Sequence, residues 1–210
     1  MPLVRKIALF DATLALWRID EDARTLSGLC TAAEAARAFA RYTGEARRRE
    51  WLAWHALLHE MEPSAEAYYE RSGAPALRGA RFIGVSHTKG YAALMLGDRP
   101  CAVDIEPEGR CFAKAAPRFL SDAERGLPMI HGERALGLVW CAKEALYKWY
   151  GQPGVDFLRD IRILRIDPEH RTLTGRIGGR TLTLHDHSAD GLLVVGCTGV
   201  RDAAPNGEIL

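Results

Sequence analysis

The sequence lacks a long hydrophobic run, a strong net charge and any Cys-x-x-Cys pair. The longest apolar run, Tyr91 to Leu96, is too short to cross a bilayer. Lys6 and Asp11 come too early for the apolar core of a secretory signal. A formal charge of +1 gives no overall field that would attract nucleic acid or an anionic membrane. We therefore expect neither of these as a partner.

The cysteines are odd in number and scattered, which predicts reduced thiols in a cytoplasmic protein. They are Cys30, Cys101, Cys111, Cys141 and Cys197. With 210 residues and 48% hydrophobic content, the chain can bury a substantial core as one domain or two small ones.

The segment from Cys101 to Glu106 alternates apolar and acidic residues, as a strand with one buried face does. Such a strand puts Asp104 and Glu106 on the same side. At a separation of about 7 Å and an effective dielectric of about 20, two carboxylates repel by about 2 kcal/mol. A divalent metal would relieve this repulsion. The alternative is that both carboxylates lie on a solvated sheet face.

The segment from Trp140 to Lys148 is typical of an amphipathic helix. Glu144 and Lys148 are four residues apart and share one stripe, opposite an apolar stripe that faces the core. Glu144 would add a third carboxylate to a metal site and Lys148 a neighbouring ammonium. The alternative is an ordinary surface ion pair.

Hydrophobic periodicity and turn residues predict an α+β fold. Thr31 with Glu34, and Ser121 with Glu124, have the spacing of capping boxes that open helices, the second of them ahead of the long helix. The predicted helices are 31–42, 45–61 and 132–150. The predicted strands are one or two in 7–19, then 66–71, 81–85, 91–96 and 101–106, of which the last three form an antiparallel meander, and finally 161–166, 172–177, 180–185 and 192–197.

The two predicted long helices suggest a faint internal duplication. An offset of about ninety residues aligns Trp51 with Trp140 and His55 with Glu144. We therefore expect two similar α+β halves with the active site in the cleft between them. The predicted halves are 1–98 and 99–200, the second carrying the metal ligands, with a loose tail at 201–210. A chain that contains both halves is expected to act as a monomer.

Two further groups could bind phosphate. Arg47, Arg48 and Arg49 lie near the start of a predicted helix and invite an anion, although such a run is more often a solvated surface than a ligand site. Ser86 and His87 begin a loop rich in hydrogen-bond donors. The His55–His59 pair lacks the glutamate of a metalloprotease helix, so we expect no zinc there.

Three motifs together resemble the 4'-phosphopantetheinyl transferase superfamily, specifically its longer, two-halved, Sfp-like branch. They occur in the order that the family has, and Arg118-Phe-Leu-Ser with Glu124 adds a fourth likeness, so the similarity covers roughly residues 45 to 155. The motifs are Gly84-Val-Ser-His-Thr88, Ala102-Val-Asp-Ile-Glu-Pro107 and Trp140-x-x-Lys-Glu-Ala-x-x-Lys148.

The resemblance implies transfer of 4'-phosphopantetheine from coenzyme A to a serine of an apo acyl- or peptidyl-carrier protein. It also implies that Asp104, Glu106 and Glu144 hold Mg²⁺, that Glu144 deprotonates the serine directly or through water, and that Lys148 binds phosphate and stabilises the leaving group. The residues expected to contact coenzyme A are Ser86, His87, Lys143, Lys148, Arg48 and Arg49.

Two departures from the family pattern predict weaker coenzyme A affinity. Ala74 replaces the lysine of a common Gly-Lys-Pro segment, and His55 replaces a frequent arginine. Two other functions stay open on this sequence: a non-catalytic module that binds coenzyme A or a carrier protein, and an unrelated metal-dependent phosphohydrolase that uses the same carboxylates.

Overall fold

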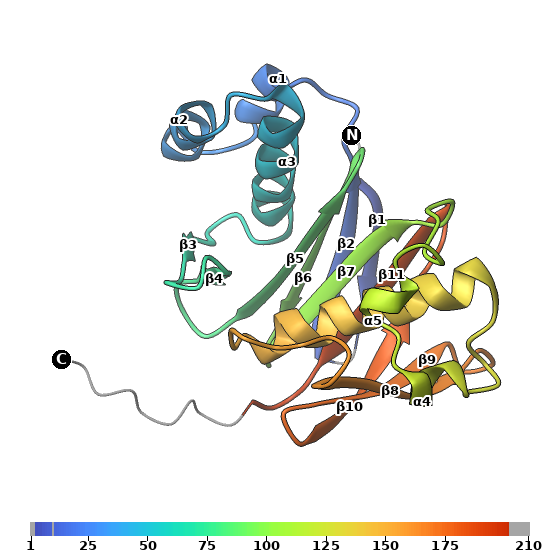
Figure 1. Cartoon of the computed structure of the whole chain (residues 1–210). Coiled ribbons are helices and arrows are strands. Elements are labelled where there is room, and N and C mark those ends of the chain that lie inside the picture. Colours follow the sequence, from blue (N-terminus) through green and yellow to red (C-terminus); the bar gives the residue numbers. More distant parts are fainter. Residues whose placement is uncertain (1–2, 10, 202–210) are drawn as a thin grey trace.

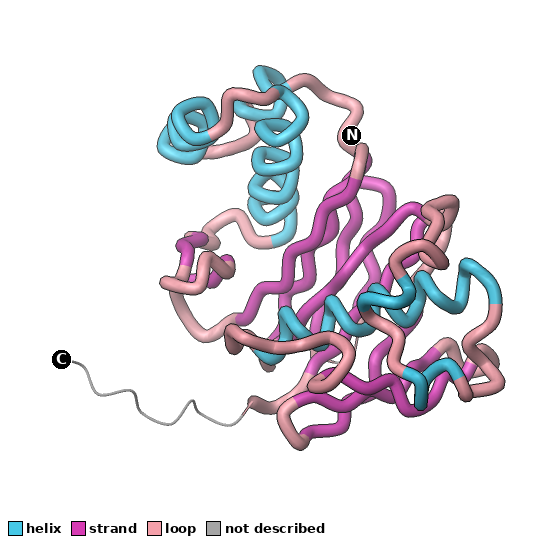
Figure 2. Tube along the Cα trace, in the orientation of Figure 1, coloured by secondary structure: helices cyan, strands magenta, loops and turns pink. Residues whose placement is uncertain are grey.

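The computed structural model describes residues 3–9 and 11–201 and has an α+β fold built on two antiparallel sheets. The first sheet has the order β1-β2-β6-β5 and the second β7-β11-β10-β9-β8. Figure 2 shows these sheets with the helices arranged around them. The strands are β1 Leu3–Ala8, β2 Ala12–Arg18, β5 Phe82–Thr88, β6 Tyr91–Gly97, β7 Cys101–Pro107, β8 Ile161–Asp167, β9 Thr172–Ile177, β10 Arg180–Asp186 and β11 Leu192–Thr198, with β3 Ala67–Tyr69 and β4 Pro75–Leu77 in a small separate hairpin.

The three long helices agree with their predicted ranges. The helices are α1 Ala23–Ser27, α2 Ala32–Arg41, α3 Glu45–Met61, η1 Ala116–Arg118, α4 Asp122–Arg125 and α5 Gly132–Tyr150. Thr31 and Glu34 form the predicted capping box of α2. Ser121 and Glu124 form a second one, but it opens the one-turn helix α4, which ends at Arg125 well before α5 begins. Elements as short as α1, α4 and β4 leave too little periodicity to be predicted.

Each sheet carries one long helix on its outer face, and the inner faces of the two sheets share a core. α3 packs on the first sheet through a cluster that includes Leu57 and Leu94. α5 packs on the second sheet through Leu146 and its neighbours. Between the sheets, β2 and β6 meet β7 and β11 through a third cluster that contains Leu14, Met95, Val103, Ile105 and Val194.

The strand that carries the two acidic residues, β7, lies at the junction between the sheets. The predicted meander is wrong at this strand: β6 is paired with β2 and β5 on its two edges, so no edge is left for β7. β7 instead pairs with β11 and lies beside β5. Gly84 of β5 approaches Ala102 of β7 so closely that a Cβ on Gly84 would be 2.8 Å from the Ala102 Cα atom.

The two halves share a pattern, although the internal duplication stays a prediction. In each, a strand is followed by a long helix and the last strand returns to pair with that first strand: β6 with β2, and β11 with β7. The second half has one more strand in its main sheet.

The predicted loose tail lies outside the described residues except for Arg201, whose guanidinium donates to the Lys148 carbonyl at 3.2 Å.

A single methyl group at the junction tests how closely β5 and β7 must approach. Gly84→Ala puts a Cβ against backbone atoms of Cys101 and Ala102, which cannot move aside as a side chain can. We expect the free energy of unfolding in urea to fall by about 1–3 kcal/mol. Gly109→Ala is the matched control, because nothing lies within 4 Å of its Cβ position. Equal stability of the two variants would contradict the close junction.

Candidate active site

A pocket of about 480 Å³ lies between the two halves of the chain. β5, α2, α3 and the β3–β4 region line it from the first half, and β7 and α5 line it from the second. It contains the three predicted metal ligands together with Lys148, Ser86 and His87. The complete lining is Arg41, Tyr42, Trp51, Trp54, Tyr69, Gly73, Pro75, Val85, Ser86, His87, Asp104, Glu106, Trp140, Glu144 and Lys148.

Asp104 is the most enclosed acid of the pocket, with 6% of its surface exposed. Its Oδ1 atom accepts hydrogen bonds from Lys148 Nζ at 2.7 Å and from Ser86 Oγ at 2.9 Å. Its Oδ2 atom is buried and has no hydrogen-bond partner among the described residues. A buried carboxylate oxygen without a donor is costly, so this atom marks a position where a cation would be stabilised.

Lys148 and Ser86 join the two halves through Asp104. The Lys148 ammonium donates to Asp104, to Ser86 Oγ at 3.1 Å and to the Val103 carbonyl at 3.2 Å. Ser86 Oγ also accepts the Ile105 amide at 3.3 Å. These bonds fix α5, β7 and β5 relative to one another at the floor of the pocket.

Glu106 faces the same pocket but one of its oxygens is already engaged. Its Oε1 atom accepts the Trp140 indole N–H at 3.0 Å and also bonds to the Arg110 guanidinium. The guanidinium of Arg110 lies over the Trp140 ring at 5.4 Å. Trp140, the first residue of the helix motif, therefore orients the Glu106 carboxylate.

Glu144 lies on α5 one turn before Lys148 and is partly buried in the pocket wall. Burial, and then the nearby charge of Asp104, raise the pKa of Glu144 to about 7, although the Lys148 ammonium opposes this rise. The residues that the structure describes donate no hydrogen bond to its carboxylate. Glu144 can therefore accept a proton, as a general base must.

The donor chemistry suits Mg²⁺, because three carboxylates, one of which has an unpaired buried oxygen, present hard oxygen ligands. Within the described part of the chain, however, no three acidic, histidine or cysteine side chains are already grouped to hold a metal ion. Asp104, Glu106 and Glu144 would have to turn toward one another to bind one ion. Lys148 and Arg110 compensate part of their charge in this conformation.

Lys143, predicted to contact coenzyme A, is not in the pocket. Its side chain is 0% exposed, forms a buried ion pair with Glu124 at 2.9 Å, and also donates to the carbonyls of Phe119, Phe157 and Ile161 at 2.6–3.0 Å. The side chain points into the second half because four oxygen atoms surround the ammonium there. In this structure Lys143 is a structural residue.

Arg48 and Arg49, the other predicted contacts, also lie outside the pocket lining. Arg48 donates to the Tyr42 carbonyl at 2.7 Å, and Arg49 donates to the Ile19 carbonyl at 2.6 Å. Arg47 is paired with Glu50 at 3.1 Å. The run therefore helps to fasten the start of α3, a role that the sequence pattern could not distinguish from anion binding.

His87 lines the pocket as predicted, at the end of β5. Its Nδ1 atom lies 3.6 Å from Glu50 Oε2. Burial lowers the pKa of His87, which the Glu50 carboxylate partly offsets. The imidazole can therefore serve as a neutral hydrogen-bonding group near neutral pH.

Sequence reasoning missed the aromatic wall of the pocket and its cation. Tyr42, Trp51, Trp54 and Tyr69 form this wall, and Arg41 lies beside it. In the sequence, the two tryptophans belong to an apolar stripe that fits a buried core equally well. The arginine just before Tyr42 fits an exposed surface equally well. His55 packs against Trp51 and Trp54 with its ring centre 3.5 Å from each of theirs, stacked on the first and tilted to the second, and burial lowers its pKa to about 4.

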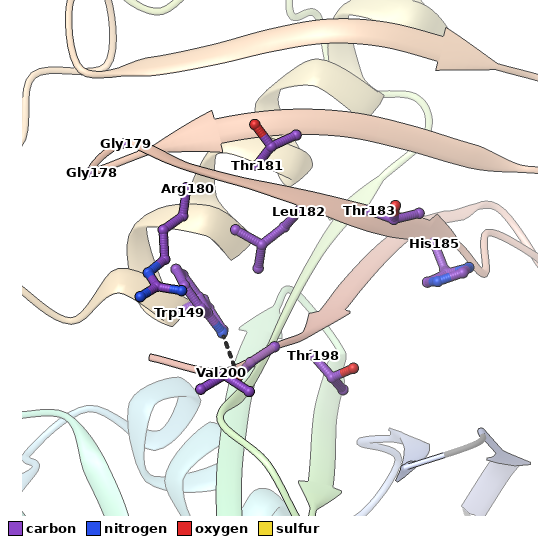
Figure 3. Close-up of a pocket in the computed structure, with 11 residues that line it drawn as sticks. Trp149, Gly178, Gly179, Arg180, Thr181, Leu182, Thr183, His185, Thr198 and Val200 are labelled. Carbon is purple, nitrogen blue, oxygen red and sulfur yellow. Dashed lines mark hydrogen bonds between the residues drawn. The ribbon is translucent and has the colours of Figure 1, made fainter. Parts of the chain in front are cut away.

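A larger cavity, of about 790 Å³, lies elsewhere, between the end of α5, the β9–β10 turn and the end of β11. Figure 3 shows Trp149, Arg180 and His185 around it. No carboxylate side chain is among the residues that line it. It therefore lacks the acidic ligands of the smaller pocket, which is the candidate active site.

The raised pKa of Glu144 predicts a pH-dependent stability in metal-free buffer. The folded protein holds a proton on Glu144 up to about pH 7, whereas the unfolded chain releases it near the ordinary value of 4.5. The free energy of unfolding should therefore fall as pH rises between these values, by on the order of 1 kcal/mol more in the native protein than in Glu144→Gln. Glu60→Gln, an exposed α3 substitution, should keep the native profile. Urea titrations at pH 5 and 8 measure this, and parallel profiles for native protein and Glu144→Gln would contradict it.

Comparison with known proteins bears on the half of the chain that carries the acids. Residues 100–195 match the family model described as the 4'-phosphopantetheinyl transferase superfamily. A search of curated proteins gave no match. None of the helices in 3–9 and 11–201 has the length and apolar character needed to span a membrane. The matched segment contains β7 and α5, with all three pocket carboxylates and Lys148. Residues 100–195 therefore belong to the 4'-phosphopantetheinyl transferase superfamily, whose general activity is phosphopantetheinyl transfer.

Proposed function

We propose that the protein transfers 4'-phosphopantetheine from coenzyme A to a serine hydroxyl of an acyl- or peptidyl-carrier protein, in the manner of the Sfp-like branch. One observation supports this most strongly. Asp104, Glu106, Glu144 and Lys148 come from two separate elements of the matched segment and line one pocket between the halves. A pyrophosphate-containing donor needs such a combination of acids and a cation.

Mg²⁺ is the proposed metal, and Asp104, Glu106 and Glu144 are its proposed ligands. When bound, the ion would neutralise charge on the pyrophosphate of coenzyme A. The unpaired Asp104 Oδ2 atom supports this assignment. The Lys148 ammonium lies 2.7 Å from Asp104 Oδ1. It would redirect one of its hydrogen bonds to a phosphate oxygen and so stabilise the departing adenosine 3',5'-bisphosphate.

Glu144 is the proposed general base. The serine oxygen attacks the phosphorus attached to the pantetheine arm, its proton passes to the Glu144 carboxylate, and the bond from that phosphorus to the bridging oxygen breaks. Adenosine 3',5'-bisphosphate leaves with the bridging oxygen, and the phosphopantetheine arm stays on the serine. The pKa of Glu144 is about 7 in the metal-free protein, and bound Mg²⁺ would lower it and keep the carboxylate ionised for this task. Ser86 and His87 would position donor phosphates beside Lys148.

Incubation of the full chain with coenzyme A, Mg²⁺ and an apo carrier protein tests the proposal by mass spectrometry. We expect phosphopantetheine on the carrier serine, and no transfer when EDTA removes the metal. Glu144→Gln should lower the turnover rate by at least about 100-fold, since general-base help is worth about 10²- to 10⁴-fold. Glu60→Gln, at an exposed position of α3, should keep the native rate.

The same assay separates the two rival functions. Binding of coenzyme A without transfer to any of several carriers would favour a non-catalytic module. Release of free phosphate without a carrier would favour a phosphohydrolase. Full transfer by Glu144→Gln would remove Glu144 from the reaction while leaving the transferase function intact.

A further inference from the structure

Arg110 bonds to one of the proposed metal ligands from outside the pocket lining. It lies in the turn after β7, where its backbone amide donates to the Pro107 carbonyl at 3.1 Å. This turn brings the side chain back over the end of the strand, and the guanidinium bonds to Glu106 Oε1. The Arg110 side chain is 40% exposed and that of Glu106 is 14% exposed. A half-exposed cation therefore occupies an oxygen atom of a more enclosed acid.

Two aromatic rings hold the Arg110 guanidinium in this position. It lies 5.3 Å from the centre of the Phe112 ring and 5.4 Å from the centre of the Trp140 ring. Phe112 is fully buried, and its backbone amide donates to Glu133 in the first turn of α5 at 2.6 Å. The ring contacts stabilise a guanidinium without any help from Glu106. Arg110 can therefore release the carboxylate and stay on the rings.

Cations of the protein itself are bonded to two of the proposed metal ligands. Lys148 bonds to Asp104 at 2.7 Å, and Arg110 bonds to Glu106. Trp140 already orients Glu106 through its indole N–H at 3.0 Å and adds no charge, so orientation alone does not require Arg110. The proposed function gives Lys148 a phosphate to bind but gives Arg110 no role. The charge that Arg110 places on Glu106 is therefore the feature to explain.

We propose that Arg110 competes with the divalent ion for the Glu106 carboxylate and so weakens metal binding. This inference rests on the proposed function through its metal site and is independent of the carrier protein. A guanidinium and a divalent ion both bond to carboxylate oxygens, and two positive charges beside one carboxylate repel each other. Within residues 3–9 and 11–201 the acids are not grouped to hold an ion, as expected while Arg110 occupies Glu106. Because the guanidinium is already half-exposed, it can leave Glu106 without being buried elsewhere.

Calorimetric titration of the full chain with Mn²⁺, without coenzyme A, tests this inference. Arg110→Gln should lower the Kd for Mn²⁺ about tenfold, because it frees Glu106 and removes a positive charge beside the ligands. Arg110→Lys should fall between, because it keeps the charge and loses the guanidinium fork. Arg134→Gln is the matched control and should leave the Kd unchanged. Arg134 forms a similar exposed pair with Glu108, and both residues lie outside the pocket lining.

Thermal unfolding gives a second readout, because Mn²⁺ at one fixed concentration should raise Tm more in Arg110→Gln than in the native protein. Tighter Mn²⁺ binding by Arg110→Gln supports the competition even in a protein that transfers nothing, which would contradict the transferase function alone. Weaker Mn²⁺ binding by Arg110→Gln would mean that Arg110 orients Glu106 for the ion and would overturn the inference. An unchanged Kd in a protein that transfers phosphopantetheine would overturn the inference alone, and failure of both proteins to bind Mn²⁺ would overturn it together with the metal site.

Discussion

The hydrogen bonds that meet at Asp104 Oδ1 are the interaction on which the candidate site depends. Lys148 from α5 and Ser86 from β5 both donate to this one oxygen of β7. Together with the apolar core between the sheets, they fix the position of the acids of the second half relative to the first half. The other oxygen of Asp104 is buried and unpaired among the described residues, which costs stability unless a cation is bound there. The fold therefore keeps an unfavourable group in place at the position proposed for the metal.

The core between the sheets explains how the chain tolerates this cost. Val103 and Ile105, which alternate with the acids of β7, are fully or almost fully buried against Leu14 and Met95 of the first sheet. The strand is thus held by its apolar side while its acidic side faces α5 and the pocket. Because β6 is paired on both edges, β7 can reach this place only by joining the second sheet.

Much of the site could be predicted because its signals are local. Alternation in Cys101–Glu106 fixed which side chains share a face, and the four-residue spacing of Glu144 and Lys148 put them on one side of a helix. The three long helices and most strands followed from the same periodicities.

The remaining features depend on tertiary contacts that no local pattern contains. Lys143 lies next to Glu144 in the sequence yet points into the core, because Glu124 and three backbone carbonyls accept hydrogen bonds from its ammonium there. Arg48 and Arg49 bond to backbone carbonyls, whereas Arg41, which no motif marked, reaches the pocket. The pairing of β7 with β11 joins residues about ninety positions apart, and local alternation cannot specify such a partner.

The most direct test of the central claim is a crystal structure of the protein with coenzyme A and Mn²⁺, with the metal located by its anomalous scattering. The account predicts one ion at the pyrophosphate, coordinated by the Asp104 and Glu144 carboxylates, with Lys148 in contact with a phosphate oxygen. A bound coenzyme A whose metal contacts neither carboxylate would contradict it.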